Sequence, residues 1–274
     1  MDPKPVDDLP ARLRAALLGA AAGEAAAEAT AGVRQLLDLG DHLVAEGGVV
    51  TTGALAAAGF GEAPGGGRAA LLLRAVPIGL LSPLDRPRLR LGAHRAVTVA
   101  GADEGTAMTA VATAVLVADL CRFDLDTALV RLRQTLLEEA PSALHARLRV
   151  LGWSEPVEGS TDPGAALQLA LTALDRSDTV DGAVAQATGF GGDVAAAAAL
   201  AGALAGARHG LAGLDEEAIA TVPAAARIDT LAARLAALAT TTAPASGLRD
   251  DAAAALARIA SGRARDPGVE SRSP

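Results

Sequence analysis

The chain has 274 residues, of which 51% are hydrophobic and only 1% aromatic. Its formal net charge is −8 and it has no lysine- or arginine-rich tract, which argues against a nucleic-acid partner. The single cysteine, Cys121, excludes an internal disulfide, and the first ten residues lack the layout of a secretion signal, so we expect a cytoplasmic protein.

The composition predicts an all-α fold. A core with so few aromatic residues must be packed from Ala, Leu and Val, which requires many closely spaced helices. The β-rich alternative would need Ile, Tyr and Phe, and these are scarce here.

We expect one main helical domain with less ordered ends. Residues 1–10 carry three prolines and several charges, which is typical of a flexible leader. Residues 11–240 are not divided by a long Pro/Ser/Gly-rich linker and are expected to form the helical domain. A linker and a terminal helix are expected over 241–262, and a disordered tail over 263–274.

The first helix is expected to start at Arg12. Gly19 and Gly23 form a ridge of small residues on its packed side. Glu24 and Glu28 would stand one turn apart on one face of this helix, where they form a candidate pair of carboxylates.

An amphipathic helix over 33–44 follows and should end at Gly47–Gly48. Thr51 or Thr52 can cap a short helix, after which the glycine-rich segment 59–68 forms a loop. A phosphate-binding loop would need a preceding strand and a following Gly-Lys-Ser/Thr. Both are missing, so we interpret this segment as a surface loop rather than a nucleotide cradle.

An apolar helix is predicted over 69–81, in which Pro77 must cause a kink or mark a break. Asp103 and Glu104 open a buried helix, and capping is favoured over metal binding for them. Asp162 is expected to cap the helix that begins with Pro163. Further helices are expected around 89–99, 125–136, 144–151, 163–174, 180–188, 216–220, 225–239 and 248–259, with Trp153 ahead of a polar loop.

The segment Gly189–Gly210 organises the rest of the chain. A glycine-rich turn places Asp193 at the start of a long alanine-rich helix, where free backbone N–H groups and the positive end of the helix dipole converge. Gly202 and Gly206 lie one turn apart on one face and allow close backbone approach, so this helix is predicted to be the central rod of a bundle. The apolar run Val194–Ala207 is shorter than the ~20 residues that a bilayer requires, so no membrane partner is expected.

Several segments resemble the ADP-ribosylglycohydrolase family, and their order and spacing along the chain agree with it. The rod, GGDVAAAAALAGALAGARHG, is similar to that family's Gly-Gly-Asp-Thr-Asp-Thr and its alanine-rich helix, and GAAAGEAAAE is similar to the opening Gly-x-x-x-Gly-Asp-Ala-x-Gly. RAVPIGLL resembles an Arg-Ala-x-Pro-x-Gly segment, and ADEGTA takes the place of a Thr-His-x-Asp-Pro turn. The resemblance implies a compact multi-helix bundle over roughly Arg12–Ala239.

The resemblance also implies a binuclear magnesium or manganese site, with ligands from an early Thr-Asp-Asp-Thr and a late Asp-x-Asp-Thr. Two such ions need several converging carboxylates. Here Thr30 and Asp193 remain at those positions, Glu24 replaces the opening aspartate, and Gly191 and Gly192 form a candidate ligand loop. The other aligned positions carry no side-chain donor: Ala31, Gly32, Val33, Val194, Ala195 and Ala196. We therefore expect no metal cofactor.

Three hypotheses follow. In the first, the chain is a catalytically inactive family member that binds an ADP-ribose-like ligand or a protein partner. In the second, it is an active ADP-ribosyl hydrolase with a rearranged site that uses Glu24, Glu28, Thr30 and Asp193. In the third, it has a purely structural or partner-binding role; the oligomeric state stays open.

Overall fold

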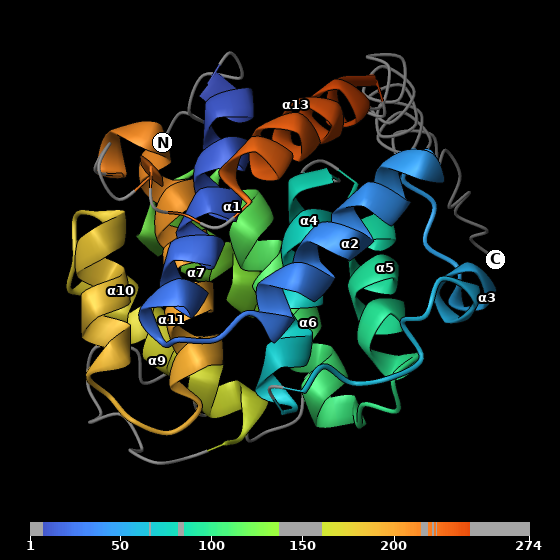
Figure 1. Cartoon of the computed structure of the whole chain (residues 1–274), viewed down its shortest axis with the longest axis horizontal. Coiled ribbons are helices and arrows are strands. Elements are labelled where there is room, and N and C mark those ends of the chain that lie inside the picture. Colours follow the sequence, from blue (N-terminus) through green and yellow to red (C-terminus); the bar gives the residue numbers. More distant parts are fainter. Residues whose placement is uncertain are drawn as a thin grey trace, which may run out of the picture. The chain divides into compact units, whose positions relative to one another are not determined.

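The fold is built from α-helices and two short 3₁₀-helices, as the sequence predicts. The computed structural model describes residues 8–65, 67–81, 85–136, 161–214, 219–220, 222 and 224–241, and no residue in these ranges lies in a strand. In chain order the elements are α1 (Leu9–Ala26), α2 (Ala31–Ala45), α3 (Thr52–Ala57), η2 (Ala69–Arg74), α4 (Ala75–Leu81), α5 (Arg86–Thr98), α6 (Glu104–Leu120), α7 (Leu125–Leu136), α9 (Pro163–Asp175), α10 (Val180–Thr188), α11 (Val194–His209), η3 (Gly210–Gly213) and α13 (Ala225–Thr241) (Figure 1).

These elements belong to one structural unit, Met1–Thr242, and the remaining residues 243–274 lie outside the described part of the chain. Several predicted features fall outside it as well. They are most of the leader, the helix over 144–151, Trp153 with its loop, most of the segment 216–220, and the linker, terminal helix and tail.

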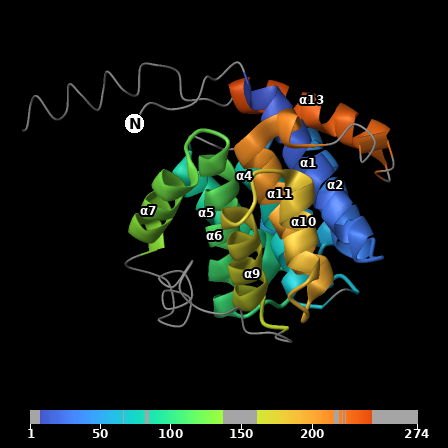
Figure 2. The ribbon, with the colours of Figure 1, turned by 90° about the vertical axis from the view of Figure 1, so that its left-hand side faces the viewer.

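Helix α11 is the centre of the bundle. It packs against α1 along much of its length and also contacts α6, α9, α10 and η2. Figure 2 shows α9, α10 and α11 side by side. The prediction of a central rod over this segment is confirmed.

Small residues bring α1 and α11 into backbone contact. A Cβ atom on Gly202 would overlap the carbonyl oxygen of Gly19, and one on Gly206 would overlap that of Ala15. From the α1 side, a Cβ on Gly23 would overlap the carbonyl of Ala198. The predicted close approach of the glycine face is therefore present, and α1 is its partner.

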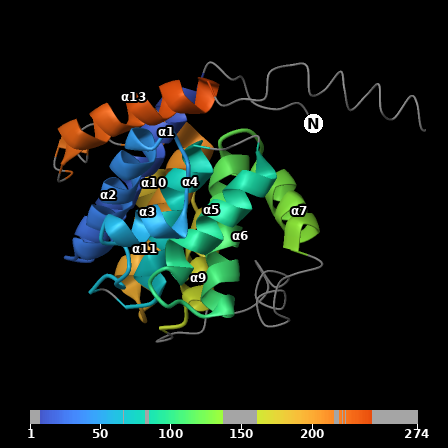
Figure 3. The ribbon, with the colours of Figure 1, turned by 90° about the vertical axis from the view of Figure 1, so that its right-hand side faces the viewer.

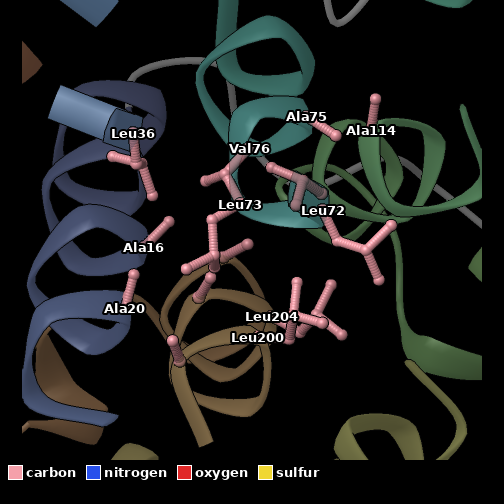
Figure 4. Packing of buried hydrophobic residues seen from close by; sticks show 14 of the residues in the cluster. Ala16, Ala20, Leu36, Leu72, Leu73, Ala75, Val76, Ala114, Leu200 and Leu204 are labelled. Carbon is pink, nitrogen blue, oxygen red and sulfur yellow. The ribbon is translucent and has the colours of Figure 1, made fainter. Parts of the chain in front are cut away.

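The core around this crossing is made of alanine, leucine and valine side chains. Residues from α1, α2, η2, α4, α6 and α11 meet there, among them Ala16, Ala20, Leu36, Leu72, Leu73, Ala75, Val76, Ala114, Leu200 and Leu204 (Figure 4). Close packing of small side chains replaces the aromatic residues that the sequence lacks.

The segment Val194–Gly213 is long and apolar enough to cross a membrane by length and composition. This stretch includes η3 and is therefore longer than the apolar run Val194–Ala207. Of the apolar window, 72% is buried inside the fold. Its apolar side chains are buried against neighbouring helices, as in the core helix of a globular bundle.

Helix starts follow the predicted capping residues. Asp193, Asp162 and Thr51 each accept a backbone N–H from the first turn of the helix that they precede. Helix α5 begins earlier than predicted, because Asp85 accepts the N–H of Arg88. Pro77 marks a break: η2 ends just before α4, so the proline lies in the first turn of α4.

Candidate functional site

Asp193 lies where the sequence places it, at the N-terminus of α11. Gly191 and Gly192 precede it with φ values of 74° and 77°, a backbone conformation that glycine adopts readily. Asp193 Oδ1 accepts the N–H of Ala196 at 3.2 Å, which caps the helix. Burial raises the pKa of Asp193, and the hydrogen bond from Ala196 opposes part of that rise.

The end of the glycine-rich loop lies beside two capping aspartates. A Cβ atom placed on Gly67 would lie 3.5 Å from Asp193 Oδ2. The next residue, Arg68, forms an ion pair with Asp103, with Nη1 2.6 Å from Oδ2. Asp103 Oδ1 meanwhile accepts the N–H of Thr106 at 2.8 Å and caps α6. The end of the loop thus lies next to the N-terminal ends of both α6 and α11, and it is ion-paired to Asp103 at the first of them.

The ion pair between the loop and Asp103 was not predictable from the sequence pattern. Asp103 was correctly interpreted as a cap, and its pKa is lowered mainly by the hydrogen bonds with Thr106, with a contribution from Arg68. The available signal was a single cationic residue, Arg68, directly after a run of glycines.

Glu24 has a different role from the one predicted. Helix α1 ends at Ala26, and Glu28 lies beyond it, exposed, with a φ of 56°. Glu24 is only 4% exposed, and its two carboxylate oxygens accept the N–H groups of Gly32 at 2.6 Å and Val33 at 2.8 Å. The prediction that Glu24 and Glu28 share one helical face is therefore wrong, because Glu24 caps α2 from the neighbouring helix.

Thr30 precedes α2 in the N-cap position but does not cap it. Its side chain accepts no hydrogen bond from the first turn, and the residue is exposed. The Glu24 carboxylate makes those bonds instead. A buried carboxylate at the positive end of α2 is also electrostatically favourable.

The residues present do not fit a pair of divalent ions. At Gly32, an added Cβ would lie 2.5 Å from Leu73 Cδ1 and 2.9 Å from Glu24 Oε1, so a carboxylate side chain there would require both side chains to move. Ala31 and Ala195, at two further aligned positions, offer no oxygen donor. Among the described residues, no group of three or more His, Cys, Asp or Glu side chains could hold a metal ion.

A buried arginine holds the other half of the glycine-rich loop. Arg74 is fully buried and donates hydrogen bonds to the main-chain carbonyls of Phe60, Glu62 and Ala96 and to Gln35 Oε1, at 2.6–2.9 Å. Its guanidinium also lies 5.4 Å from the centre of the Phe60 ring. Burial lowers the pKa of Arg74 to about 10. Arg74 therefore holds the first half of the loop through the carbonyls of Phe60 and Glu62, and the Arg68–Asp103 ion pair holds its end.

The sequence and the fold both resemble those of known proteins. A family model described as ADP-ribosylglycohydrolase matches residues 45–245, a range that includes the loop and Asp193 but not Glu24 or Thr30. A solved structure described as an ADP-ribosylglycohydrolase-related protein complex has a TM-score of 0.73 at 19% identity and covers 85% of this chain and 99% of its own. No curated protein sequence matches this chain.

Proposed function

This chain belongs to the ADP-ribosylglycohydrolase family, and on that premise we propose that it is a non-catalytic member whose helical scaffold binds an ADP-ribose-like ligand or a protein partner. The observation that carries the proposal is the start of α2. There the Glu24 carboxylate is committed to two backbone N–H groups, and Leu73 fills the space beside Gly32. The free oxygen ligands that a divalent cation needs are therefore missing at this position.

The groups that remain at the candidate site support direct binding of a ligand. Asp193 Oδ2 can accept a hydrogen bond from a ribose hydroxyl. Arg68, whose side chain is 65% exposed, can pair with a phosphate in exchange for Asp103. An ADP-ribose-like ligand carries both kinds of group, and a peptide with serine and acidic side chains offers similar chemistry.

One observation favours the alternative of an active hydrolase with a rearranged site. The raised pKa of Asp193 makes this carboxyl the best candidate for a general acid in the described part of the chain. Against it, Glu24 is engaged in capping and Glu28 lies outside the helix. Of the four residues in this hypothesis, only Thr30 and Asp193 therefore remain available for catalysis.

The decisive experiment measures binding and turnover in parallel. ADP-ribose is titrated calorimetrically into the full chain in EDTA, in Mg²⁺ and in Mn²⁺, and release of ADP-ribose from a modified peptide is followed under the same conditions. We expect binding that does not depend on the metal and no turnover. Arg68→Gln should weaken binding, whereas Arg176→Gln, an exposed arginine at the end of α9, should not.

Each other outcome contradicts the proposal in a different way. Metal-stimulated release of ADP-ribose would show an active enzyme. Metal-independent release that Asp193→Ala abolishes would favour the rearranged site. Absence of binding both to ADP-ribose and to a protein partner would leave the purely structural role.

A further inference from the structure

We propose that a hollow between α1, α2 and the start of α13 binds a small organic anion with an apolar body. Its lining does not include Asp193 or Arg68, although it shares Glu24 and Thr30 with the candidate metal positions. The hollow has a volume of about 260 Å³. α13 packs against both α1 and α2 and lies across them in Figures 1 and 3, while α1 and α2 have few contacts with each other. Ala224 and Arg227, at the start of α13, line the hollow together with residues of α1 and α2.

The walls of the hollow are fixed before any ligand arrives. Glu24 ties the end of α1 to the start of α2 through its two hydrogen bonds, across a turn of only the residues 27–30. Two non-glycine residues in the described part of the chain have a positive φ. Glu28, in that turn, has a φ of 56°, and Ala224, which lines the hollow, has a φ of 62°. Such conformations persist only where surrounding structure enforces them.

The inner wall is apolar. Ala21, Val33 and Leu37 line the hollow, and each is at least nine-tenths buried. Ala25, in the last turn of α1, lines the hollow from an exposed position. These side chains offer contact to a hydrocarbon or aromatic body and no hydrogen bond.

The polar groups that stay available at the hollow are donors. The Arg34 guanidinium is exposed, and no residue in the described part of the chain pairs with it. Asp38, one turn further along α2, is bonded to Arg227 at 2.7 Å. The Thr30 hydroxyl makes no capping bond. Glu24, the acidic residue in the lining, already accepts two N–H groups. A guanidinium and a hydroxyl beside an apolar wall fit a carboxylate or phosphate attached to an apolar group.

The size of the hollow limits the ligand. Pockets for drug-sized ligands are usually ~300–1,000 Å³, so this one suits a smaller molecule and is too small to enclose ADP-ribose. The proposal therefore goes beyond the function proposed above and does not depend on it. A small aromatic or branched aliphatic acid, or its phosphate counterpart, matches both the volume and the donors.

The test uses benzoate and phenyl phosphate as probes, with benzamide as the uncharged control, each titrated into the full chain by calorimetry or NMR. We expect the anions to bind and benzamide to bind much more weakly. Tighter binding of phenyl phosphate would identify a phosphate ligand, and tighter binding of benzoate a carboxylate. Arg34→Gln should weaken anion binding about tenfold or more.

Two further variants separate this site from other effects. Ala25→Phe should block the hollow, whereas Arg176→Gln should leave probe binding unchanged. Circular dichroism confirms that each variant is folded, and any affinity for ADP-ribose should be the same in Arg34→Gln and in the unmodified chain. The proposal is overturned if neither anion binds, if benzamide binds equally well, or if Arg34→Gln and Arg176→Gln have equal effects.

Discussion

Gly19 of α1 and Gly202 of α11 face each other so closely that a Cβ atom on either one would overlap the carbonyl oxygen of the other. Gly202→Ala must therefore push the two helices apart. We expect it to lower the free energy of unfolding by about 2 kcal/mol or more, measured by urea denaturation.

The matched control is Gly105→Ala. Gly105 is exposed in the first turn of α6, and an added Cβ would meet only Asp103 Oδ1, at 3.6 Å. This substitution should raise stability by about 0.5–1 kcal/mol, as alanine does in an unobstructed helix. Equal effects at the two positions would contradict the proposed role of the crossing.

Removal of the Glu24 carboxylate should be costly. Glu24→Ala leaves the buried N–H groups of Gly32 and Val33 without their acceptors, and we expect a loss of about 2 kcal/mol or more of unfolding free energy. Glu28→Ala, at an exposed position only four residues away, should change stability by less than about 0.5 kcal/mol. Similar losses for both variants would indicate that Glu24 does not cap α2.

Asp193 and Asp103 should respond oppositely to neutralisation. Burial raises the pKa of Asp193, so its charge costs stability at neutral pH, and this cost disappears below the ordinary pKa of 3.8, where the carboxyl is protonated in both states. Asp193→Asn keeps a good N-cap residue and should be more stable than the unmodified chain at pH 7. This advantage should shrink as the pH falls toward 3.8.

Asp103→Asn should show the reverse sign. Hydrogen bonds with Thr106 and the Arg68 pair lower the pKa of Asp103, so its charge stabilises the fold above 3.8, and that contribution is lost as the pH falls through the lowered pKa. Denaturation of both variants over a pH series provides the measurement. The same sign for both at pH 7 would refute these assignments.

Substitution of Arg74 should release the glycine-rich loop. Arg74→Met keeps an apolar stem but leaves the carbonyls of Phe60, Glu62 and Ala96 without their donor. We expect faster amide hydrogen exchange over 59–68 and a loss of about 1–3 kcal/mol of stability. Arg176→Met is the control and should change neither; unchanged exchange in Arg74→Met would show that the loop is held by other contacts.

Much of the fold was predictable because its signals are local. Asp162 and Asp193 stand directly before the helices that they cap, and the glycine spacing in α11 shows a face that must meet another backbone. What the pattern does not show is the partner. The partner is α1, and only tertiary packing decides this, although Gly19 and Gly23 were recognisable in the sequence as a ridge of small residues.

The candidate site was harder to predict, because its contacts join distant segments. Glu24 caps a helix that begins seven residues later, and the alanine-rich sequence around Glu28 gives no stop signal where α1 ends. The chain leaves the helix through a left-handed residue that is glutamate rather than glycine. The Arg68–Asp103 pair spans 35 positions, and no helical or strand periodicity connects them.

The alanines of α11 have no rotamers to lose when the chain folds. Folding of this helix therefore costs little side-chain entropy. The distance between the axes of α11 and α1 is set by main-chain atoms rather than by side-chain shape. The crossing of α1 and α11 therefore does not depend on the polar residues at the N-terminus of α11, because its contacts are made by glycine and alanine.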